Sequence, residues 1–366
     1  MDELKGESIV MIRRIKPTFT AISLFIILCF LAVWLKFLFT PLITDPAGIH
    51  YQLAPGTSLH AFSDDLHRRG ILRHPIYFNL LARLHNSAHE LKAGVYLFPV
   101  GMTPSALLAE VTSGRGLVFQ VFTIIPGWNF LQLRMALNHN PHLEHNLLHL
   151  SDQELMQTLG APVPSPEGQF FPDSYYFTEG SSDLKLLKRA YERMQSKLQK
   201  AWSARLEDTP FLNPYQALIA ASLVEREAAL SAERPVIAGV LINRLQRKMP
   251  LQFDPTIVYS LGPRFNGTLD KKDLTFDTPY NTYLHHGLPP TPIAIPSLDA
   301  LNAVLHPVQH AYFYFVAKSN GSHQFSKTLE EHHIAVSMLR RHDDGFFNYE
   351  LLQHYLSISL TAKENT

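Results

Sequence analysis

Two glutamates, Glu225 and Glu227, stand in an otherwise apolar stretch with helical character that runs from Tyr215 to Leu230. An ionised carboxyl group loses solvation when it is buried, so it must be paired, or its pKa must rise until it takes up a proton. A carboxyl group that stays protonated near neutral pH can act as a general acid. The pair is therefore a candidate proton donor for catalysis.

The spacing of the two glutamates assigns them different roles. Helix positions two apart project about 200° from each other, so both carboxyl groups cannot reach into one cleft. A structural alternative is that one of them only pairs with an arginine, and Arg226, Arg234 and Arg244 are the candidates.

Further motifs follow this helix in a fixed order, and one precedes it. They are EGQFFPDSYYF (167–177), VLINRL (240–245), LQFDPTIVYSLG (251–262) and YNTYLHHGLPPTPIAIPSLDAL (280–301). Together with the Glu-x-Glu pair, this succession resembles the endolytic murein transglycosylases, the YceG-like family. The resemblance covers roughly everything after the apolar N-terminal segment. One departure is Pro126 before Gly127, where members of the family commonly carry an acidic residue.

The resemblance implies a lyase that works without cofactor or metal. Such an enzyme cleaves the bond between N-acetylmuramic acid and N-acetylglucosamine in peptidoglycan and leaves a 1,6-anhydro end. Matching the family motif puts the catalytic acid and base at Glu227, with Glu225 in a supporting role. Family members cut within nascent glycan strands and so limit their elongation, and peptidoglycan synthases are possible neighbours.

Five further residues are candidates for substrate contacts or support. Amide, carboxylate and hydroxyl groups give directional hydrogen bonds to a neutral polar sugar, and flat rings stack on sugar faces. These candidates are Gln252, Asp254, Thr256, Asn281 and Tyr283. For the first three, the structural alternative is turn and cap chemistry, because Asp254-Pro255-Thr256 is also a good helix start. For Asn281 and Tyr283, the alternative is a place in the core.

Two other functions fit parts of the sequence. The first is a membrane-anchored, non-catalytic scaffold that binds glycan. Such a protein, however, has no need for a desolvated acid on a core helix. A hydrolase that uses water requires a second carboxylate across the cleft, for which Asp254 and Glu167 are the candidates.

Composition excludes several classes of protein. The chain has 366 residues and a formal net charge of zero, which argues against nucleic acid as a partner. Its single cysteine, Cys29, lies in the apolar N-terminal run, so no disulfide framework can form within one chain. The histidines are scattered without the spacing of a zinc hydrolase, and no metal site is expected.

The segment from Phe19 to Phe39 is apolar enough to span a membrane, for which roughly 20 residues are needed. Arg13, Arg14 and Lys16 precede it, which by the positive-inside rule places the N-terminus in the cytoplasm. We expect a single-pass protein of the inner (plasma) membrane with its catalytic domain on the periplasmic side. A cleaved signal peptide is the alternative, but the run is longer than a normal signal core and no Ala-x-Ala site follows.

The chain is expected to be α+β. We predict a cytoplasmic tail (1–17), a transmembrane helix (18–40), a small LysM-like α/β module (45–117), a larger mixed catalytic domain (118–350) and a C-terminal tail (351–366). The LysM-like assignment comes from the resemblance, and such modules bind glycan strands.

Local signals define the elements of these domains. In the module we expect strands at 50–53 and 91–98, a helix at 59–69 capped by Ser58, a helix after Pro75, and a helix that opens at Thr103-Pro104 and ends before Gly114. In the larger domain we expect strands at 118–125 and 312–317, the latter in the core, and helices at 183–206 and around 334–341.

Overall fold

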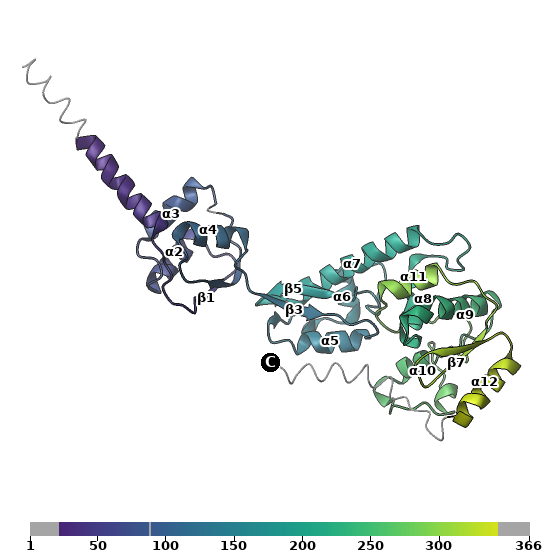
Figure 1. Cartoon of the computed structure of the whole chain (residues 1–366). Helices are drawn as coiled ribbons and strands as arrows, with labels where there is room; N and C mark the ends of the chain where they lie inside the picture. Colours follow the sequence, from purple (N-terminus) through teal and green to yellow (C-terminus); the bar gives the residue numbers. More distant parts are fainter. Residues whose placement is uncertain (1–21, 88, 343–366) are drawn as a thin grey trace, which may run out of the picture. The chain divides into compact units, whose positions relative to one another are not determined.

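A computed structural model describes residues 22–87 and 89–342. It mixes helices with short strands, as the sequence predicts, and every sheet has two strands. The described chain forms two compact units (Figure 1). Unit 1 holds the residues up to Gln120 together with Phe177–Gly180, and unit 2 holds Val121–Tyr176 and the residues from Ser181 onward. The predicted tails, 1–17 and 351–366, lie outside the described residues, as do the basic residues before the apolar run.

Unit 1 begins with the apolar helix Ile22–Phe39, which is long and apolar enough to cross a membrane. Strand β1 (Ile49–Leu53) pairs antiparallel with β2 (Gly94–Phe98). Three helices complete the unit: α2 (Leu59–Arg68), α3 (Pro75–Leu84) and α4 (Pro104–Ser113).

The caps predicted for unit 1 are confirmed. The Ser58 hydroxyl accepts a hydrogen bond from the backbone N–H of Ala61 at the start of α2. Thr103 caps α4 in the same way. Helix α4 ends at Gly114, whose φ of 77° is the left-handed conformation that glycine adopts without a steric penalty.

Unit 2 contains most of the described helices. They are α5 (Phe130–Asn138), α6 (Asp152–Thr158), α7 (Asp183–Ser203), α8 (Pro214–Glu227), α9 (Arg234–Gln246), α10 (Asp254–Leu261), α11 (Leu298–Leu305) and α12 (Leu329–His342). Its short strands form two pairs: β4 (Leu143–Glu144) with β6 (Ser181–Ser182), and β7 (Tyr314–Ala317) with β8 (His323–Ser326). A further pair joins β3 (Phe119–Thr123) to β5 (Ser174–Thr178).

Helix α8 is the centre of unit 2. The side chain of Asn213 accepts a hydrogen bond from the backbone N–H of Gln216 and caps the helix, and Pro214 occupies the first turn. Every residue from 217 to 224 is buried, because α8 packs against α7, α9, α10 and α11. Figure 1 shows α8, α9 and α11 side by side. A helix that is apolar all round belongs inside a core.

Two predictions about unit 2 are wrong in detail. The helix predicted from Tyr215 to Leu230 ends at Glu227, because Ala228 has extended backbone angles (φ −84°, ψ 102°). Glu227 is therefore the last residue of the helix and does not lie in its middle. Strand β7, predicted as core, is half-buried at Tyr314, Phe315 and Val316.

Candidate active site

The carboxyl group of Glu227 lies at the C-terminal end of α8. The residue is half-buried, but its Oε2 is buried and has no hydrogen-bond partner among the residues that the structure describes. Burial, followed by the charge of Asp254, raises the pKa of Glu227 to about 8, against the lowering effect of Arg244 and Arg226. Such a group stays protonated at neutral pH and can donate its proton.

Glu225 has entirely different surroundings. Its Oε1 accepts a hydrogen bond of 2.8 Å from Nη2 of Arg234 in a buried ion pair. Its Oε2 accepts bonds from the backbone N–H and the hydroxyl of Ser297, at 2.9 and 2.5 Å. Ser297 caps α11, so Glu225 ties the end of α8 to the starts of α9 and α11. Among the arginines considered from the sequence, Arg234 is the one that pairs with Glu225.

The segment that carries Gln252 is held by Arg244 of α9. The guanidinium donates to the carbonyl oxygens of Phe313, Pro250 and Leu251 and to the side-chain oxygen of Gln252. Gln252 itself has a φ of 54°, the left-handed region that non-glycine residues seldom adopt. A strained backbone of this kind persists only where its surroundings fix it, and it is commonly found at functional sites.

Asp254 is the first residue of α10, as the predicted helix start requires. The Tyr283 hydroxyl donates a short hydrogen bond to its carboxylate. Two more bonds join the same segments: the backbone N–H of Gln252 donates to the carbonyl of Thr282 at 3.0 Å, and that of Phe253 donates to the Thr282 hydroxyl at 3.0 Å. The structure therefore brings the 252–256 and 280–283 motifs together, and Asp254 lies near enough to act on Glu227.

Thr256 and Asn281, by contrast, are fully buried and bonded within the protein. The Thr256 hydroxyl donates to the carbonyl of Phe253. The Asn281 amide donates to the carbonyls of Leu274 and Phe276, and its oxygen accepts from the backbone N–H groups of Tyr283 and Leu284. All four bonding positions of this amide are used, which favours a role in holding the loop over contact with a sugar.

Glu167, the alternative second carboxylate, is also buried. Both of its oxygens accept from the backbone N–H of Phe130 at the start of α5, and the Tyr259 hydroxyl donates to Oε2. Burial outweighs the lowering effect of these bonds and raises the pKa of Glu167 to about 7. Unlike Asp254, Glu167 is not among the charged groups that shift the pKa of Glu227.

Two residues that help to build this site received no site role from the sequence. The sequence suggests Arg244 only as an ion-pair partner. Thr282 is not among the candidate site residues, although its neighbours Asn281 and Tyr283 are. Both stand inside the recognised motifs, Asn-Arg-Leu and Tyr-Asn-Thr-Tyr. Their position in those motifs was the available signal.

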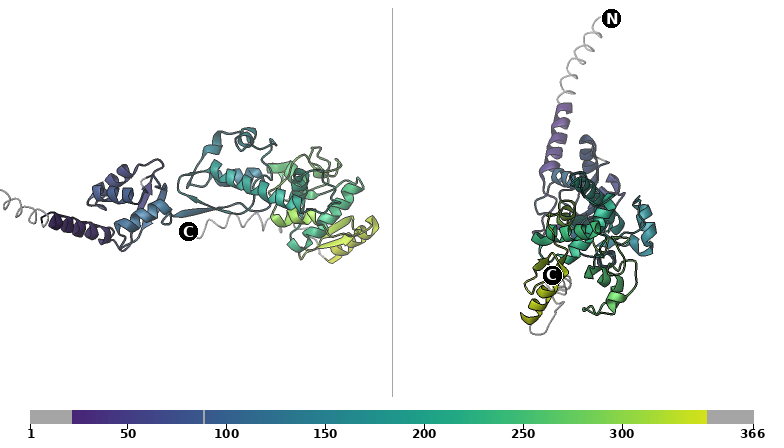
Figure 2. Two further views of the ribbon diagram at one scale, coloured as in Figure 1. Left: turned by 90° about the horizontal axis from the view of Figure 1, so that it is seen from above. Right: turned by 90° about the vertical axis from the view of Figure 1, so that its right-hand side faces the viewer.

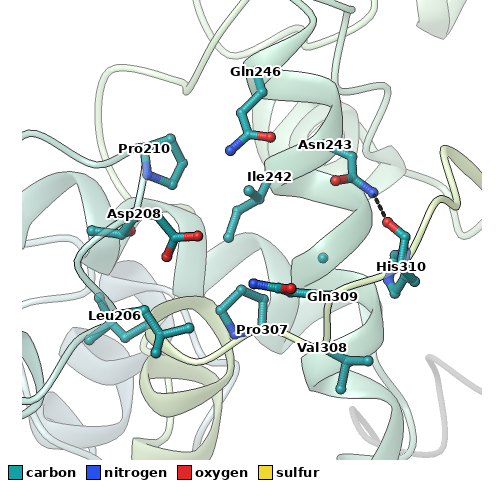
Figure 3. A pocket seen from close by; sticks show the side chains of 13 residues that line it. Leu206, Asp208, Pro210, Ile242, Asn243, Gln246, Pro307, Val308, Gln309 and His310 are labelled. Carbon is teal, nitrogen blue, oxygen red and sulfur yellow. Dashed lines mark hydrogen bonds between the residues drawn. The ribbon is translucent and has the colours of Figure 1, made fainter.

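A pocket of about 250 Å³ lies elsewhere in unit 2, between α9 and the segment after α11 (Figure 3). Gly239 forms part of its wall, since a Cβ there would lie 2.5 Å from Nε2 of His310. The Asn243 amide donates to the carbonyl of His310 at 2.9 Å and fixes the other wall. None of the predicted site residues lines this pocket.

Comparison with known proteins identifies the family to which a chain with these motifs and this mixed fold belongs. The model of the YceG-like family matches residues 51–338, and the chain belongs to that family. The resemblance read from the motifs is thereby confirmed.

Curated relatives and one solved structure are similar to the chain. The endolytic murein transglycosylase of Bacillus subtilis (strain 168) is 31% identical over 304 residues, which are 78% of this chain and 83% of that protein. The endolytic murein transglycosylase of Streptococcus pneumoniae serotype 2 is 28% identical over 309 residues, which are 76% of this chain but 56% of that protein. A crystal structure of a protein described as YceG-like from Listeria monocytogenes matches with a TM-score of 0.52 and 25% identity, covering 79% of this chain and 99% of that one.

Proposed function

We propose that this protein is an endolytic lytic transglycosylase of peptidoglycan, with Glu227 as its catalytic acid and base. The proposal is carried by the carboxyl group of Glu227, in a chain of the YceG-like family. Its Oε2 is buried without a hydrogen-bond partner in the described part of the chain, and its pKa is about 8. The curated relatives named endolytic murein transglycosylase support the same activity.

The reaction needs one proton donor and no external nucleophile. Protonated Glu227 gives its proton to the oxygen that leaves with N-acetylglucosamine, and the bond from that oxygen to the anomeric carbon of muramic acid breaks. The Glu227 carboxylate then takes the proton of the muramic acid 6-hydroxyl, whose oxygen closes on the anomeric carbon. The 1,6-anhydro ring forms within one sugar, so the nucleophile is already close to the atom it attacks.

Asp254 acts on this step through its charge. Its carboxylate raises the pKa of Glu227 and so keeps the acid protonated before cleavage. Positive charge then develops at the anomeric carbon in the oxocarbenium-like transition state, and a fixed nearby carboxylate stabilises that charge. Tyr283 holds the Asp254 carboxylate through its hydroxyl.

The remaining site residues divide into two groups. We assign substrate contacts to Gln252 and Tyr283, which are not fully buried. Thr256 and Asn281 position the segments on which those residues stand, because their own polar groups are satisfied inside the protein. Glu225 supports the site by fixing the end of α8.

The proposed location is the inner (plasma) membrane. The apolar helix Ile22–Phe39, within the predicted span of 18–40, would cross the membrane once with the N-terminus in the cytoplasm. A LysM-like module (45–117) and a catalytic domain (118–350) would follow on the periplasmic side. The short connection to β1 holds the module near the bilayer, where new strands emerge, so cutting there would limit strand length and bring peptidoglycan synthases close.

Product analysis on uncrosslinked glycan strands tests the proposal. The full-length protein, Glu227→Gln and the control Glu207→Gln are compared by mass analysis of the new ends. Glu207 is an exposed residue after α7, so the control makes the same chemical change away from the site. We expect 1,6-anhydro ends from the wild type and the control, and a loss of at least about 10²-fold in rate for Glu227→Gln.

Each other outcome points to a different function. Reducing ends would show that water is the nucleophile, and Asp254 would become the first candidate for the second carboxylate. Strands that are bound but not cut by the wild type would favour the non-catalytic scaffold.

A further inference from the structure

Helix α3 of unit 1 presents a row of large apolar side chains to solvent. Ile76, Leu80 and Leu84 are 72%, 38% and 67% exposed. They are spaced four residues apart and therefore form one stripe along the helix. Phe78 and Leu81, on the opposite side of α3, are buried in the core of unit 1. The stripe is thus a second apolar face that this core does not cover.

The apolar stripe adjoins the contact between α3 and the N-terminal apolar helix. Tyr77, one position after Ile76, packs edge-on against Phe37 and Trp34 of that helix, with ring centroids 5.5 and 6.3 Å apart. One position on a helix is a rotation of about 100°, so Tyr77 borders the stripe. Figures 1 and 2 show the C-terminal end of the N-terminal helix lying against the rest of unit 1. Apolar surface therefore continues from the N-terminal helix onto α3.

The length of the N-terminal helix fixes how far α3 can stand from a bilayer. The described part of the helix, Ile22–Phe39, has 18 residues and spans roughly 27 Å at 1.5 Å per residue. The hydrocarbon core of a bilayer is about 30 Å thick, so the whole helix is needed to cross it. Phe37 and Trp34 lie only about 3 and 8 Å before the end of the helix. A residue that packs against both, as Tyr77 does, must lie at the membrane interface.

Residues at the edges of the stripe suit the same environment. Arg83 is exposed and projects beside Ile76 and Leu80, on the side of the stripe away from Tyr77. Arg73 is exposed just before α3. Arginine side chains reach lipid phosphates while their stems cover apolar surface, and tyrosine and tryptophan favour the headgroup region. An apolar stripe with such flanks is typical of a helix that lies in a membrane interface.

We propose that the stripe of Ile76, Leu80 and Leu84 rests in the outer surface of the bilayer that the N-terminal helix crosses. Unit 1 then has two attachments to the membrane, a spanning helix and an interfacial helix, and its orientation toward the bilayer is fixed. This inference rests on the proposed membrane span.

Fluorescence quenching in vesicles tests the contact, because the chain has one cysteine, Cys29, inside the N-terminal helix. An environment-sensitive dye on Cys29 reports on the span itself. In a Cys29→Ser background, Leu84→Cys places the dye at the far end of the stripe. Gln52→Cys is the matched control, because Gln52 is exposed and projects from β1 opposite the buried Tyr51.

The full-length variants are reconstituted into vesicles of phosphatidylethanolamine and phosphatidylglycerol. The lipids carry nitroxide quenchers either near the headgroups or deep in the acyl chains. We expect headgroup quenchers to reduce the Leu84→Cys signal several-fold more than the Gln52→Cys signal. Equal quenching of Leu84→Cys and Gln52→Cys, together with quenching of the Cys29 dye by the deep lipid quenchers, would overturn the interfacial contact and leave the span intact. A Cys29 signal that no lipid quencher reaches would overturn the span as well. A blue-shifted Leu84→Cys signal without lipid quenching would mean that protein covers the stripe, and would also overturn the proposal.

Discussion

At the scale of single residues, the protonation of Glu227 is governed by its surroundings. Burial is the largest cause of its raised pKa, and the charge of Asp254 is the next. Arg244 and Arg226 act in the opposite direction and are not strong enough to cancel this effect. The protonated form therefore dominates at neutral pH and is lost as the pH rises through about 8.

This order of causes predicts the pH dependence of catalysis. Because the first step needs protonated Glu227, kcat/KM for strand cleavage should fall above about pH 8. Asp254→Asn removes a negative charge that raises the pKa of Glu227, so the alkaline limb should move to lower pH and maximal activity should also fall. The measurement is kcat/KM against pH for the wild type, Asp254→Asn and the control Asp270→Asn, whose charge does not act on Glu227. A limb that stays in place in Asp254→Asn would contradict the assignment.

Residue types in the motifs predicted which polar groups gather at the site but could not say how each is used. Asn281 and Tyr283 stand two positions apart in one loop, yet the first is saturated by backbone groups while the second reaches the Asp254 carboxylate. Hydrogen bonds to distant carbonyl groups depend on tertiary structure. The sequence showed an amide able to form hydrogen bonds to a sugar. It gave no sign that the carbonyl groups of Leu274 and Phe276 already accept both hydrogens of the Asn281 amide.

At the scale of elements, Glu225 joins three helices through a buried ion pair. Its partner Arg234 opens α9, and its other partner, Ser297, caps α11. Removing one charge of a buried pair leaves the other uncompensated, which typically costs about 3–5 kcal/mol. Glu225 should therefore matter to stability in a way that Glu227 does not.

Comparison of the two glutamine variants tests this difference. At pH 7 we expect Glu225→Gln to lower the free energy of unfolding by about 3 kcal/mol, because Arg234 loses its close, buried counter-charge and keeps only the exposed Asp299 at 4.0 Å. Glu227→Gln should change stability little at that pH, since the native carboxyl group is already mostly neutral. Chemical denaturation of both variants beside the wild type measures the effect. Equal losses in the two variants would mean that Glu227 is also a structural group.

Local signals predicted the beginnings of helices better than their ends. Ser58 before α2 and Thr103 before α4 could be recognised from the sequence, because a cap acts within one turn. The end of α8 has no such signal, since Ala228, Ala229 and Leu230 are all acceptable in a helix. The chain leaves the helix there and returns through α9, which brings Arg234 back to Glu225. That contact is tertiary and invisible to local pattern.

At the scale of the whole molecule, nothing in the sequence indicates where one segment belongs. Phe177–Gly180 belongs to unit 1 although it lies far along the chain from the rest of that unit. No local pattern marks those four residues as different from their neighbours. The proposed catalytic residues, in contrast, all fall within unit 2.

That division predicts how a form lacking residues 1–40 behaves. Unit 2 keeps Glu227, Asp254 and the loop with Tyr283, so cleavage of soluble uncrosslinked strands should stay within a few fold of the full-length rate. The truncated form should float with membranes far less than the full-length protein, because it lacks the apolar helix Ile22–Phe39 and keeps only the proposed interfacial stripe of α3. Flotation assays and anhydro-end counts on the same preparations, with circular dichroism as the folding check, measure both effects. If the truncated form instead trims chain ends in purified wall sacculi and leaves nascent strands untouched, the proposed endolytic activity is wrong.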